Sequence, residues 1–371
     1  MQLADRRFTI DSSGIRKVFD LAASLKNPCN LSIGLPDYDV PDAVKESAFD
    51  AIRAGHNRYT VTAGVPELRG RILSMYRDRG QNFDDSIVVS GTSGGLLLTF
   101  SALLNPGDEM MITDPYFVMY KHLCNFIGGV PKYIDTYPDF RLRREALEAA
   151  WSPKCKLLVI NSPNNPTGAV YSREELKMAA EFAAEKNLTV LSDEIYESFV
   201  YDEDFASIAD YTDPENTIVI SGLSKSVAMT GWRLGWAVGP KDFIKALTEI
   251  QQYTFVCAPA PAQQMAFTAM DFDMSEYMAL FKKRRDLIAD GLTELGFEVE
   301  RSRGAFYIFP KAPWGTGEEF VRRCVENELL VVPGNIFSEQ NTHFRISFAA
   351  STEQLERGLG ILKELREPAA V

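Results

Sequence analysis

The residue that points most directly to chemistry is Lys225, in the segment Ser221-Gly-Leu-Ser-Lys-Ser-Val-Ala-Met-Thr-Gly-Trp-Arg233. It follows an apolar run that predicts a buried strand, and hydroxyl side chains stand on both sides of it. An amine in such surroundings, near a second cation, has a lowered pKa and can act as a nucleophile. Arg233 comes eight residues later, and its planar fork suits a phosphate or a carboxylate. The alternative interpretation is a lysine that packs its stem in a loop and extends its amine into solvent.

Two further segments place polar groups directly after apolar runs. Asn161-Ser-Pro-Asn-Asn-Pro-Thr-Gly168 brings two amides to the end of a strand, although Asn, Pro and Gly are also ordinary turn residues. Ser192-Asp-Glu-Ile-Tyr196 contains Asp193, a carboxylate that is costly in a partly dry site unless it faces a cation or a proton donor. Tyr196 adds a phenol three residues later. A helix N-cap and a surface tyrosine would explain the same pattern.

An arginine interrupts the apolar segment Thr342-His-Phe-Arg-Ile-Ser-Phe348. A charge in the middle of such a strand is unusual, because charged side chains are rarely buried without a partner. Arg345 therefore either packs its stem and extends its head into solvent, or binds an anion in a cleft.

The loop Gly91-Thr-Ser-Gly-Gly95 lies between a strand and an apolar helix, and three interpretations of it stay open. Small residues let the backbone approach a ligand, and hydroxyls with free N–H groups at a helix start suit a phosphate. The same letters fit the nucleophile elbow of a serine hydrolase, with Ser93 as the nucleophile. That reaction needs a histidine, His122 or His343, and no His-Gly-Gly segment precedes Ser93. The third interpretation is a tight turn.

An alternation of apolar runs and helical stretches, beginning at residue 86, positions these loops. Five runs predict buried strands, at residues 87–89, 110–112, 156–160, 188–191 and 217–220. Most intervals between them can hold a crossover helix, which predicts an α/β fold with a parallel sheet covered on both faces. One helix begins with the capping box Ser172-Arg-Glu-Glu175. Ligands of such sheets lie beyond the carboxyl ends of the strands, where the loops fall.

Beyond about residue 275 the pattern predicts a smaller α+β unit. It consists of a long helix at 275–295, extended segments at 297–300 and 305–309, a helix near 318–327, a strand at 344–348 and a final helix. The Gly- and Pro-rich segment 34–41 is the predicted crossing between an N-terminal arm and the large domain.

The composition narrows the class of partner. The 371 residues carry a formal charge of −12 without a basic block, which argues against nucleic acid or an anionic membrane. No signal-peptide pattern opens the chain, and the longest apolar stretch, 94–104, is too short for a membrane span. Five scattered cysteines with no CxxC pair predict a soluble protein with reduced thiols in the cytoplasm. Three separated histidines predict no metal site.

Taken together and in this order, the segments SPNNPTG, DEIYE and SKSVAMTGWRLGW resemble the class I and II aminotransferases of fold type I, which use pyridoxal 5'-phosphate. The resemblance runs from SIGLPDYDVP to FRISFA, nearly the whole chain. It implies a large domain with a mostly parallel seven-stranded sheet in αβα layers, a smaller α+β domain from both chain ends, and a homodimer with shared active sites. The implied division is 1–40 for an N-terminal arm and part of the small domain, 41–274 for the large cofactor-binding domain, and 275–371 for the small C-terminal domain.

The resemblance also implies roles around the cofactor ring. Lys225 resembles the lysine that forms a Schiff base with the cofactor and later moves the substrate proton. Asp193 resembles the carboxylate that keeps the pyridine nitrogen protonated, so that the ring can act as an electron sink. Tyr196 and Asn165 resemble the pair that hydrogen-bonds the phenolic oxygen, and Phe117 the aromatic residue that stacks on the ring.

At the two ends of the site the resemblance implies binding groups. The phosphate ligands would be Gly91, Thr92, Ser93 and Arg233, with Tyr59 reaching the phosphate of the neighbouring subunit. Many family members carry Ser or Thr three residues before the lysine, where this chain has Gly222, so Ser221 or Ser224 could take that contact. Arg345 and Gly34, with Asn165, resemble the groups that bind the substrate α-carboxylate.

The implied reaction moves the α-amino group of an L-amino acid to a 2-oxo acid, with aspartate, an aromatic or another neutral amino acid as donor. Dicarboxylate specificity stays open, because Ser93 replaces the lysine of some aspartate-specific relatives and no second arginine is identified. Carbon–sulfur β-elimination or decarboxylation on the same site is the alternative. A serine hydrolase through Ser93 and His343 is a distant one. A non-catalytic sensor is disfavoured because no DNA-binding region is attached, and an NAD enzyme because no G-x-G-x-x-G occurs.

Overall fold

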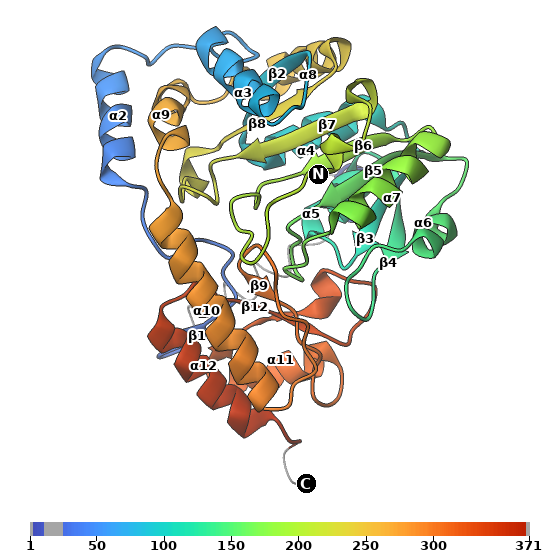
Figure 1. Ribbon diagram of the computed structural model, residues 1–371, viewed down its shortest axis with the longest axis vertical. Coiled ribbons are helices and arrows are strands. Elements are labelled where there is room, and N and C mark those ends of the chain that lie inside the picture. The colour runs from blue at the N-terminus through green and yellow to red at the C-terminus, as the bar shows by residue number, and fades with distance from the viewer. Residues whose placement is uncertain (1–2, 11–24, 369–371) are drawn as a thin grey trace.

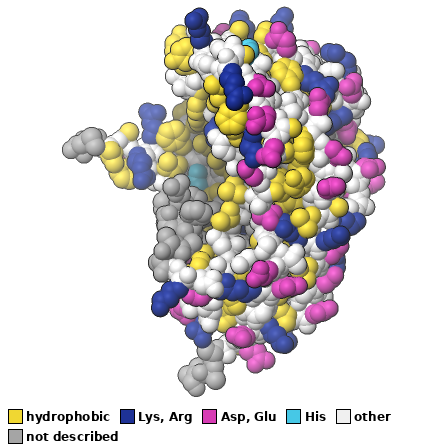
Figure 2. Space-filling view, turned by 90° about the vertical axis from the view of Figure 1, so that its left-hand side faces the viewer, with side chains coloured by type: hydrophobic (Ala, Val, Ile, Leu, Met, Phe, Trp, Pro, Cys, Tyr) yellow, Lys and Arg dark blue, Asp and Glu magenta, His cyan; other side chains and the backbone are white. Residues whose placement is uncertain are grey.

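The computed structural model describes residues 3–10 and 25–368. Residues 1–2 and 11–24 of the predicted N-terminal arm, and residues 369–371, lie outside the described residues. Figure 1 shows a large unit around a central sheet and a smaller unit below it, with the long helix α10 starting beside the large unit and running along the smaller one. On the face drawn in Figure 2, acidic and basic side chains are interspersed, and no large patch of one sign gathers there. None of the helices in the described ranges is both long and apolar enough to cross a membrane.

The large unit is built on a seven-stranded sheet in the order β2-β8-β7-β6-β5-β3-β4. Its strands are β2 (Asp85–Ser90), β3 (Glu109–Asp114), β4 (Val130–Asp135), β5 (Cys155–Asn161), β6 (Thr189–Asp193), β7 (Thr217–Gly222) and β8 (Leu234–Gly239). Neighbouring strands are parallel, except that β8 is antiparallel to β2 and β7. The predicted α/β fold with a mostly parallel seven-stranded sheet is confirmed.

Two of these strands, β4 and β8, are not among the five apolar runs, and each has a local reason. β4 is an edge strand that contains Pro131 and Lys132 and is half-buried, so it lacks a continuous apolar run. β8 carries Gly235 opposite Gly222 of β7. A Cβ on Gly222 would lie 2.9 Å from the Gly235 Cα, so these glycines let the two strands approach closely.

Helices cover both faces of this sheet, as a buried parallel sheet requires. The helices α4, α5 and α8 pack on one face around side chains such as Ile112 and Val159. The other face is covered by α2, α3 and α9 at one end and by α6 and α7 at the other. Their bounds are α2 (Asp42–Arg53), α3 (Pro66–Asp78), α4 (Gly91–Leu103), α5 (Val118–Phe126), α6 (Arg144–Ala150), α7 (Arg173–Glu185), α8 (Lys241–Thr254) and α9 (Ala260–Met270). The predicted capping box is present: Ser172 Oγ accepts from Glu175 N at 3.2 Å, and Glu175 Oε2 accepts from Ser172 N at 2.7 Å.

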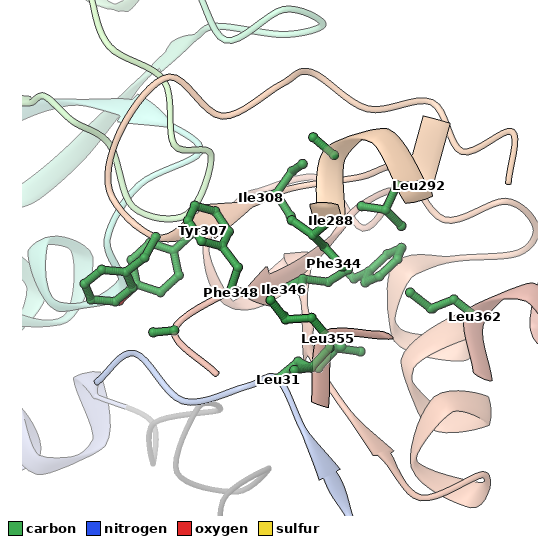
Figure 3. Packing of buried hydrophobic residues seen from close by; sticks show 14 of the residues in the cluster. Leu31, Ile288, Leu292, Tyr307, Ile308, Phe344, Ile346, Phe348, Leu355 and Leu362 are labelled. Carbon is green, nitrogen blue, oxygen red and sulfur yellow. The ribbon is translucent and has the colours of Figure 1, made fainter. Parts of the chain in front are cut away.

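The small unit joins residues from both sides of the large one. Its helices and strands are β1 (Cys29–Asn30), α10 (Ser275–Glu294), β9 (Tyr307–Ile308), α11 (Gly317–Glu326), β10 (Leu329–Leu330), β11 (Val332–Pro333), β12 (Phe344–Ser347) and α12 (Thr352–Leu365). β1 pairs with β10 in parallel, and β12 lies between β11 and β9 in an antiparallel sheet. Figure 3 shows Leu31, from the segment after β1, packed with Ile346 and Leu355 in one buried cluster. The described residues also form short 3₁₀ helices, of which η5 (Gly334–Ile336) lies between β11 and β12. The others are η1 (Asp5–Thr9), η2 (Ile208–Asp210), η3 (Pro214–Asn216) and η4 (Thr230–Trp232).

The extended segments expected after α10 are shorter in the structure. Residues 297–300 form no strand, because Phe297 N donates to Leu292 O at 3.0 Å and closes the end of the helix. Of residues 305–309, only the two of β9 pair with β12. Beyond β9 the pairing is isolated: Lys311 N donates to Glu298 O at 2.9 Å, and Lys311 forms a single bridge with His343.

The segment 34–41 runs from the small unit to the start of α2, and three contacts hold it. Asp37 accepts a two-pronged interaction from Arg284 on α10, at 2.7 and 2.8 Å. Tyr38 Oη donates to Ser226 O at 3.0 Å. Its ring also packs against Tyr277 of α10, with 4.3 Å between the ring centroids. This segment therefore connects α10 with the loop that carries the predicted lysine.

Candidate active site

A cavity of about 280 Å³ lies where the carboxyl ends of β5, β6 and β7 face the small unit. This is the edge at which open α/β sheets bind ligands. Most of the residues predicted from the sequence line it together: Gly34, Thr92, Ser93, Phe117, Asn165, Asp193, Tyr196, Ser224, Lys225, Arg233 and Arg345. The neighbouring Tyr116 does not line it, and its hydroxyl donates to Glu339 at 2.8 Å.

Lys225 follows β7 and points its amine into this cavity. Its Nζ donates to Gly34 O at 2.8 Å. Burial, together with the nearby cations of Arg345 and Arg233, lowers the pKa of the amine to about 8, and Asp193 opposes this shift. With this pKa about a tenth of the amine is unprotonated at pH 7, far more than for an ordinary lysine. The unprotonated amine is the state that attacks carbonyl carbon or accepts a proton.

Asp193 ends β6 and is buried in the wall of the cavity. Tyr120 Oη donates to its Oδ2 at 2.6 Å, and Ile195 N to its Oδ1 at 3.3 Å. Burial raises the pKa of the carboxyl group to about 6, whereas these hydrogen bonds and Lys225 oppose the rise. The group is mostly ionised at neutral pH, and a cationic ligand beside it would stabilise that charge.

Arg345 projects from β12 and is only 1% exposed. Its Nη1 donates to Asn165 Oδ1 at 3.0 Å and its Nη2 to Ser32 O at 2.8 Å, while Nε is buried without a partner. The guanidinium lies 4.4 Å from the ring centroid of Tyr307 and 4.6 Å from that of Phe337. Burial lowers its pKa. Because no carboxylate of the described chain pairs with this buried cation, a carboxylate ligand would offset the cost of its desolvation.

An anion cradle forms at the opposite end of the cavity. Thr92 and Ser93 lie in the first turn of α4, where backbone N–H groups have no partner inside the helix. Gly91 precedes them with a φ of +66°, and a Cβ there would lie 2.5 Å from Arg233 Nη2. A side chain at this position would therefore displace the guanidinium. Ser224 lines the same cavity from the lysine loop.

Six residues outside the predicted set also line the cavity: Leu35, Tyr120, Asn161, Ile195, Thr230 and Tyr307. Asn161 opens the predicted Asn-rich loop, and its amide bonds the backbone of Asp193 and Asn165, each at 3.0 Å. Asn161 is the last residue of β5, and a polar residue at the carboxyl end of a strand is the sequence signal that could have identified it. Tyr120 lies on α5 one turn beyond the predicted aromatic residue. Tyr307 lies in an apolar run typical of a core strand, so the sequence holds no signal for it.

Three predicted residues do not line the cavity: Gly91, Ser221 and Tyr59. Gly91 nevertheless touches Arg233, as described above. The Ser221 hydroxyl lies 3.4 Å from both Glu194 O and Glu197 Oε1, so it is occupied elsewhere. Tyr59 is 83% exposed on the outside of this chain.

A serine hydrolase would need a histidine beside Ser93, and neither candidate is placed there. His343 stacks on Phe309, with 5.2 Å between the ring centroids, and burial lowers its pKa to about 4. His122 lines a separate apolar hollow with Leu97 and other residues. Neither histidine is among the described residues that line the cavity, so the geometry does not support the hydrolase interpretation of the Gly91 loop.

Comparison with known proteins agrees with this geometry. Residues 26–362 match the family model of aminotransferase class I and II. A protein of Methanocaldococcus jannaschii named "Probable aspartate aminotransferase" is 39% identical over 380 residues, covering 98% of this chain and 100% of that protein. An aromatic-amino-acid aminotransferase 2 of Thermococcus litoralis is 35% identical, with 98% of each chain covered. The solved structure of the Thermus thermophilus aspartate aminotransferase with maleate has a TM-score of 0.94 at 34% identity, covering 98% of this chain and 100% of that one.

The chain belongs to the class I and II aminotransferase family. It is a transaminase, and its cofactor is pyridoxal 5'-phosphate. The cavity fits that cofactor: the cradle at Gly91 and Arg233 suits a phosphate, the buried carboxylate of Asp193 suits a protonated pyridine nitrogen, and Lys225 supplies an amine for the aldehyde. When bound, the cofactor supplies an electron sink for the negative charge that develops on the substrate α-carbon.

Proposed function

We propose that the enzyme transfers the α-amino group of an L-amino acid to a 2-oxo acid, and that aspartate or an aromatic amino acid serves as donor. The observation that carries the proposal is one cavity that holds the buried amine of Lys225, the buried carboxylate of Asp193 and the buried guanidinium of Arg345. The donor classes are supported by relatives whose names specify aspartate, aromatic amino acids or aspartate and prephenate.

Lys225 is the catalytic base in this proposal. It would hold the cofactor covalently. Once the substrate amine had released it, it would accept the proton from the substrate α-carbon and deliver it to the cofactor, and in the second half of the cycle it would carry a proton in the opposite direction. A pKa of about 8 makes its amine able to do both near neutral pH. Asp193 would stabilise a protonated pyridine nitrogen, and Tyr120 orients that carboxylate through its hydrogen bond of 2.6 Å.

The remaining residues bind and orient. Tyr196 and Asn165 would hydrogen-bond the phenolic oxygen, and Phe117 would stack on the ring. The proposed phosphate ligands are Gly91, Thr92, Ser93, Ser224 and Arg233. Ser224 is preferred to Ser221, because only the former lines the cavity. Arg345 would bind the substrate α-carboxylate, with Gly34 and Asn165 beside it, and every L-amino acid and 2-oxo acid carries that group.

We also propose a homodimer with shared sites. Tyr59 and Val61 are exposed, and Gln251 Nε2 donates to Thr62 O at 2.7 Å, which fixes this strip beside the end of α8. Tyr253 of α8 is exposed as well. Large exposed apolar side chains that lie close together are typical of an interface, and Tyr59 could there reach the neighbouring cofactor phosphate. The proposal keeps the domain division at 1–40, 41–274 and 275–371, and the free cysteines favour the cytoplasm.

The test is a spectral and product screen of the holoenzyme. Each amino acid is mixed with the enzyme without an acceptor, and conversion to the aminated cofactor is followed by absorbance; a 2-oxo acid is then added and the new amino acid is measured. Aspartate or aromatic donors should complete both halves. Release of ammonia with pyruvate, or of carbon dioxide, in place of amino-group transfer would contradict the proposal. Lys225→Ala should abolish visible absorbance and turnover, and a variant that kept both would also overturn it.

A further inference from the structure

Tyr307 lies where the large and small units meet. It is 1% exposed, lines the cavity and stands at the side of the small unit's core that faces the large unit (Figure 3). On β9 it pairs with Ser347 of β12, and Arg345 lies two residues before that partner on the same face of the sheet. This register places the Tyr307 ring beside the guanidinium, 4.4 Å from its central carbon to the ring centroid.

The hydroxyl of Tyr307 reaches the other groups of the site. Its Oη lies 2.9 Å from the Oη of Tyr196. It also touches Gly34 so closely that a Cβ on that glycine would collide with it. Gly34 O in turn accepts the hydrogen bond from Lys225. The Tyr307 hydroxyl therefore contacts both the Tyr196 phenol, which is proposed to face the cofactor, and Gly34, whose carbonyl accepts the hydrogen bond from the lysine.

The two phenols share one hydrogen bond and hold two protons. Among the described residues, neither hydroxyl has another hydrogen-bond partner. If Tyr196 donated, its proton would be used on Tyr307 and unavailable to a ligand. If Tyr307 donates, the Tyr196 proton is left for an acceptor in the cavity. Burial raises the pKa of both phenols, so both protons stay in place near neutral pH.

We propose that Tyr307 is a positioning residue: its hydroxyl donates to Tyr196 and so directs the Tyr196 proton into the cavity, while its ring supports the Arg345 guanidinium. The inference rests on the proposed function, in which Tyr196 meets the phenolic oxygen of the cofactor. The titratable and charged groups around Tyr196 are Tyr120, Asp193, Lys225, Tyr307 and Arg345. Of these, Tyr307 is the group hydrogen-bonded to its hydroxyl.

A phenol that accepts a hydrogen bond becomes a stronger donor, because successive hydrogen bonds polarise one another. With Tyr307 in place, Tyr196 therefore stabilises negative charge on the cofactor oxygen more strongly. Loss of the Tyr307 hydroxyl should weaken that stabilisation and favour the protonated chromophore. The pH midpoint of the visible absorbance of the bound cofactor should then rise.

The experiment is a pH titration of the absorbance of the holoenzyme and of Tyr307→Phe, which keeps the ring and removes the hydroxyl. We expect the midpoint to rise by about half a unit to one unit, with the KM for the amino acid changed by less than about twofold. The matched control is Tyr201→Phe, which removes a hydroxyl bonded to Ala305 O elsewhere in the same core cluster and should leave the midpoint unchanged. A second variant, Tyr307→Leu, also removes the ring and should raise the KM for the amino acid about tenfold.

An unchanged midpoint in Tyr307→Phe would overturn the inference, and so would an equal shift in Tyr201→Phe, since the effect would then belong to the core as a whole. Failure of the proposed function looks different. In that case the unmodified enzyme itself would show no cofactor absorbance or no amino-group transfer, and both proposals would fall together.

Discussion

The two ends of the cavity are assembled in different ways. At the end proposed to hold the phosphate, Gly91, Thr92 and Ser93 are consecutive residues at the start of one helix, joined by Ser224 and Arg233 from a single loop. The end proposed to hold the substrate carboxylate draws its groups from distant parts of the chain: Gly34, Asn165, Tyr307 and Arg345. There, the hydrogen bond from Arg345 to the Ser32 carbonyl alone spans 313 positions.

This difference separates what each end depends on. The phosphate end relies on backbone N–H groups and on a glycine conformation, both set by local sequence. The carboxylate end relies on one buried side chain held by packing between the two units. Substitutions at the first end should therefore change cofactor affinity, and substitutions at the second should change the use of the amino acid.

The largest effect is expected at Arg345. Arg345→Lys keeps the charge but loses the planar fork and its packing between two rings, so kcat/KM for the amino acid should fall about 100-fold to 1000-fold. Steady-state kinetics measures this, and the affinity for the cofactor should stay within about twofold. The matched control is Arg301→Lys, because Arg301 forms an exposed ion pair with Asp286 of α10. An equal loss of cofactor affinity in Arg345→Lys would remove the distinction between the two ends.

The pKa of Lys225 compares the two ends directly. Burial lowers this pKa most, and a cation from each end adds to the shift, so that it reaches about 8 from an ordinary value of 10.5. A cation disfavours the protonated amine, so removing one should raise the pKa. Arg345→Met should raise it more than Arg233→Met, since Arg345 is the larger influence. The measurement is the pH dependence of Lys225 acetylation in cofactor-free protein, read by mass spectrometry. A midpoint near 10.5 in the unmodified protein, or a larger shift from Arg233→Met, would contradict the prediction.

Gly91→Ala should act on the cofactor alone. At a φ of +66° a side chain is strained, and its Cβ would meet Arg233, so the cofactor dissociation constant should rise about tenfold to 100-fold. Equilibrium dialysis of the cofactor measures this, and the KM for the amino acid at saturating cofactor should be unchanged. Gly70→Ala in α3, which has open space for a methyl group, is the control and should leave both constants as they are.

The smallest effect distinguishes two serines of the same loop. Ser224→Ala should weaken cofactor binding by about threefold to tenfold, as expected for one lost hydrogen bond. Ser221→Ala should change it by less than about twofold, because that hydroxyl faces Glu194 and Glu197 rather than the cavity. A cofactor titration of the two variants, side by side, would contradict the assignment if the Ser221 variant bound more weakly.

The sequence predicts most of the fold and most of the residues that line the cavity, for physical reasons. Apolar runs and one capping box report local structure, so most strands and α7 follow from them. The edge strand β4 and the glycine-containing β8 lack such runs and emerge only from the tertiary pairing. Motif order placed Lys225, Asp193 and Arg345, whose residue types are unusual in apolar surroundings.

Side-chain direction is what the sequence does not contain. Ser221 and Ser224 are the same residue type in the same segment, so the sequence does not distinguish them. Only the path of the chain after β7 decides that Ser224 faces the cavity. Tyr307 looks like any core aromatic residue until the register of β9 against β12 places it beside Arg345. Tyr120 becomes informative only once α5 has been packed against the end of β6, where it meets Asp193.

We expect Lys225 to be the residue that holds the cofactor, and chemical trapping distinguishes it from the other lysines. The holoenzyme is reduced with borohydride, digested, and searched by mass spectrometry for the peptide that carries the reduced cofactor. The cofactor-derived mass should be found on Lys225 and should be lost from digests of Lys225→Ala. A label on another lysine, such as Lys121, or an unlabelled Lys225 in an enzyme that shows cofactor absorbance, would contradict it.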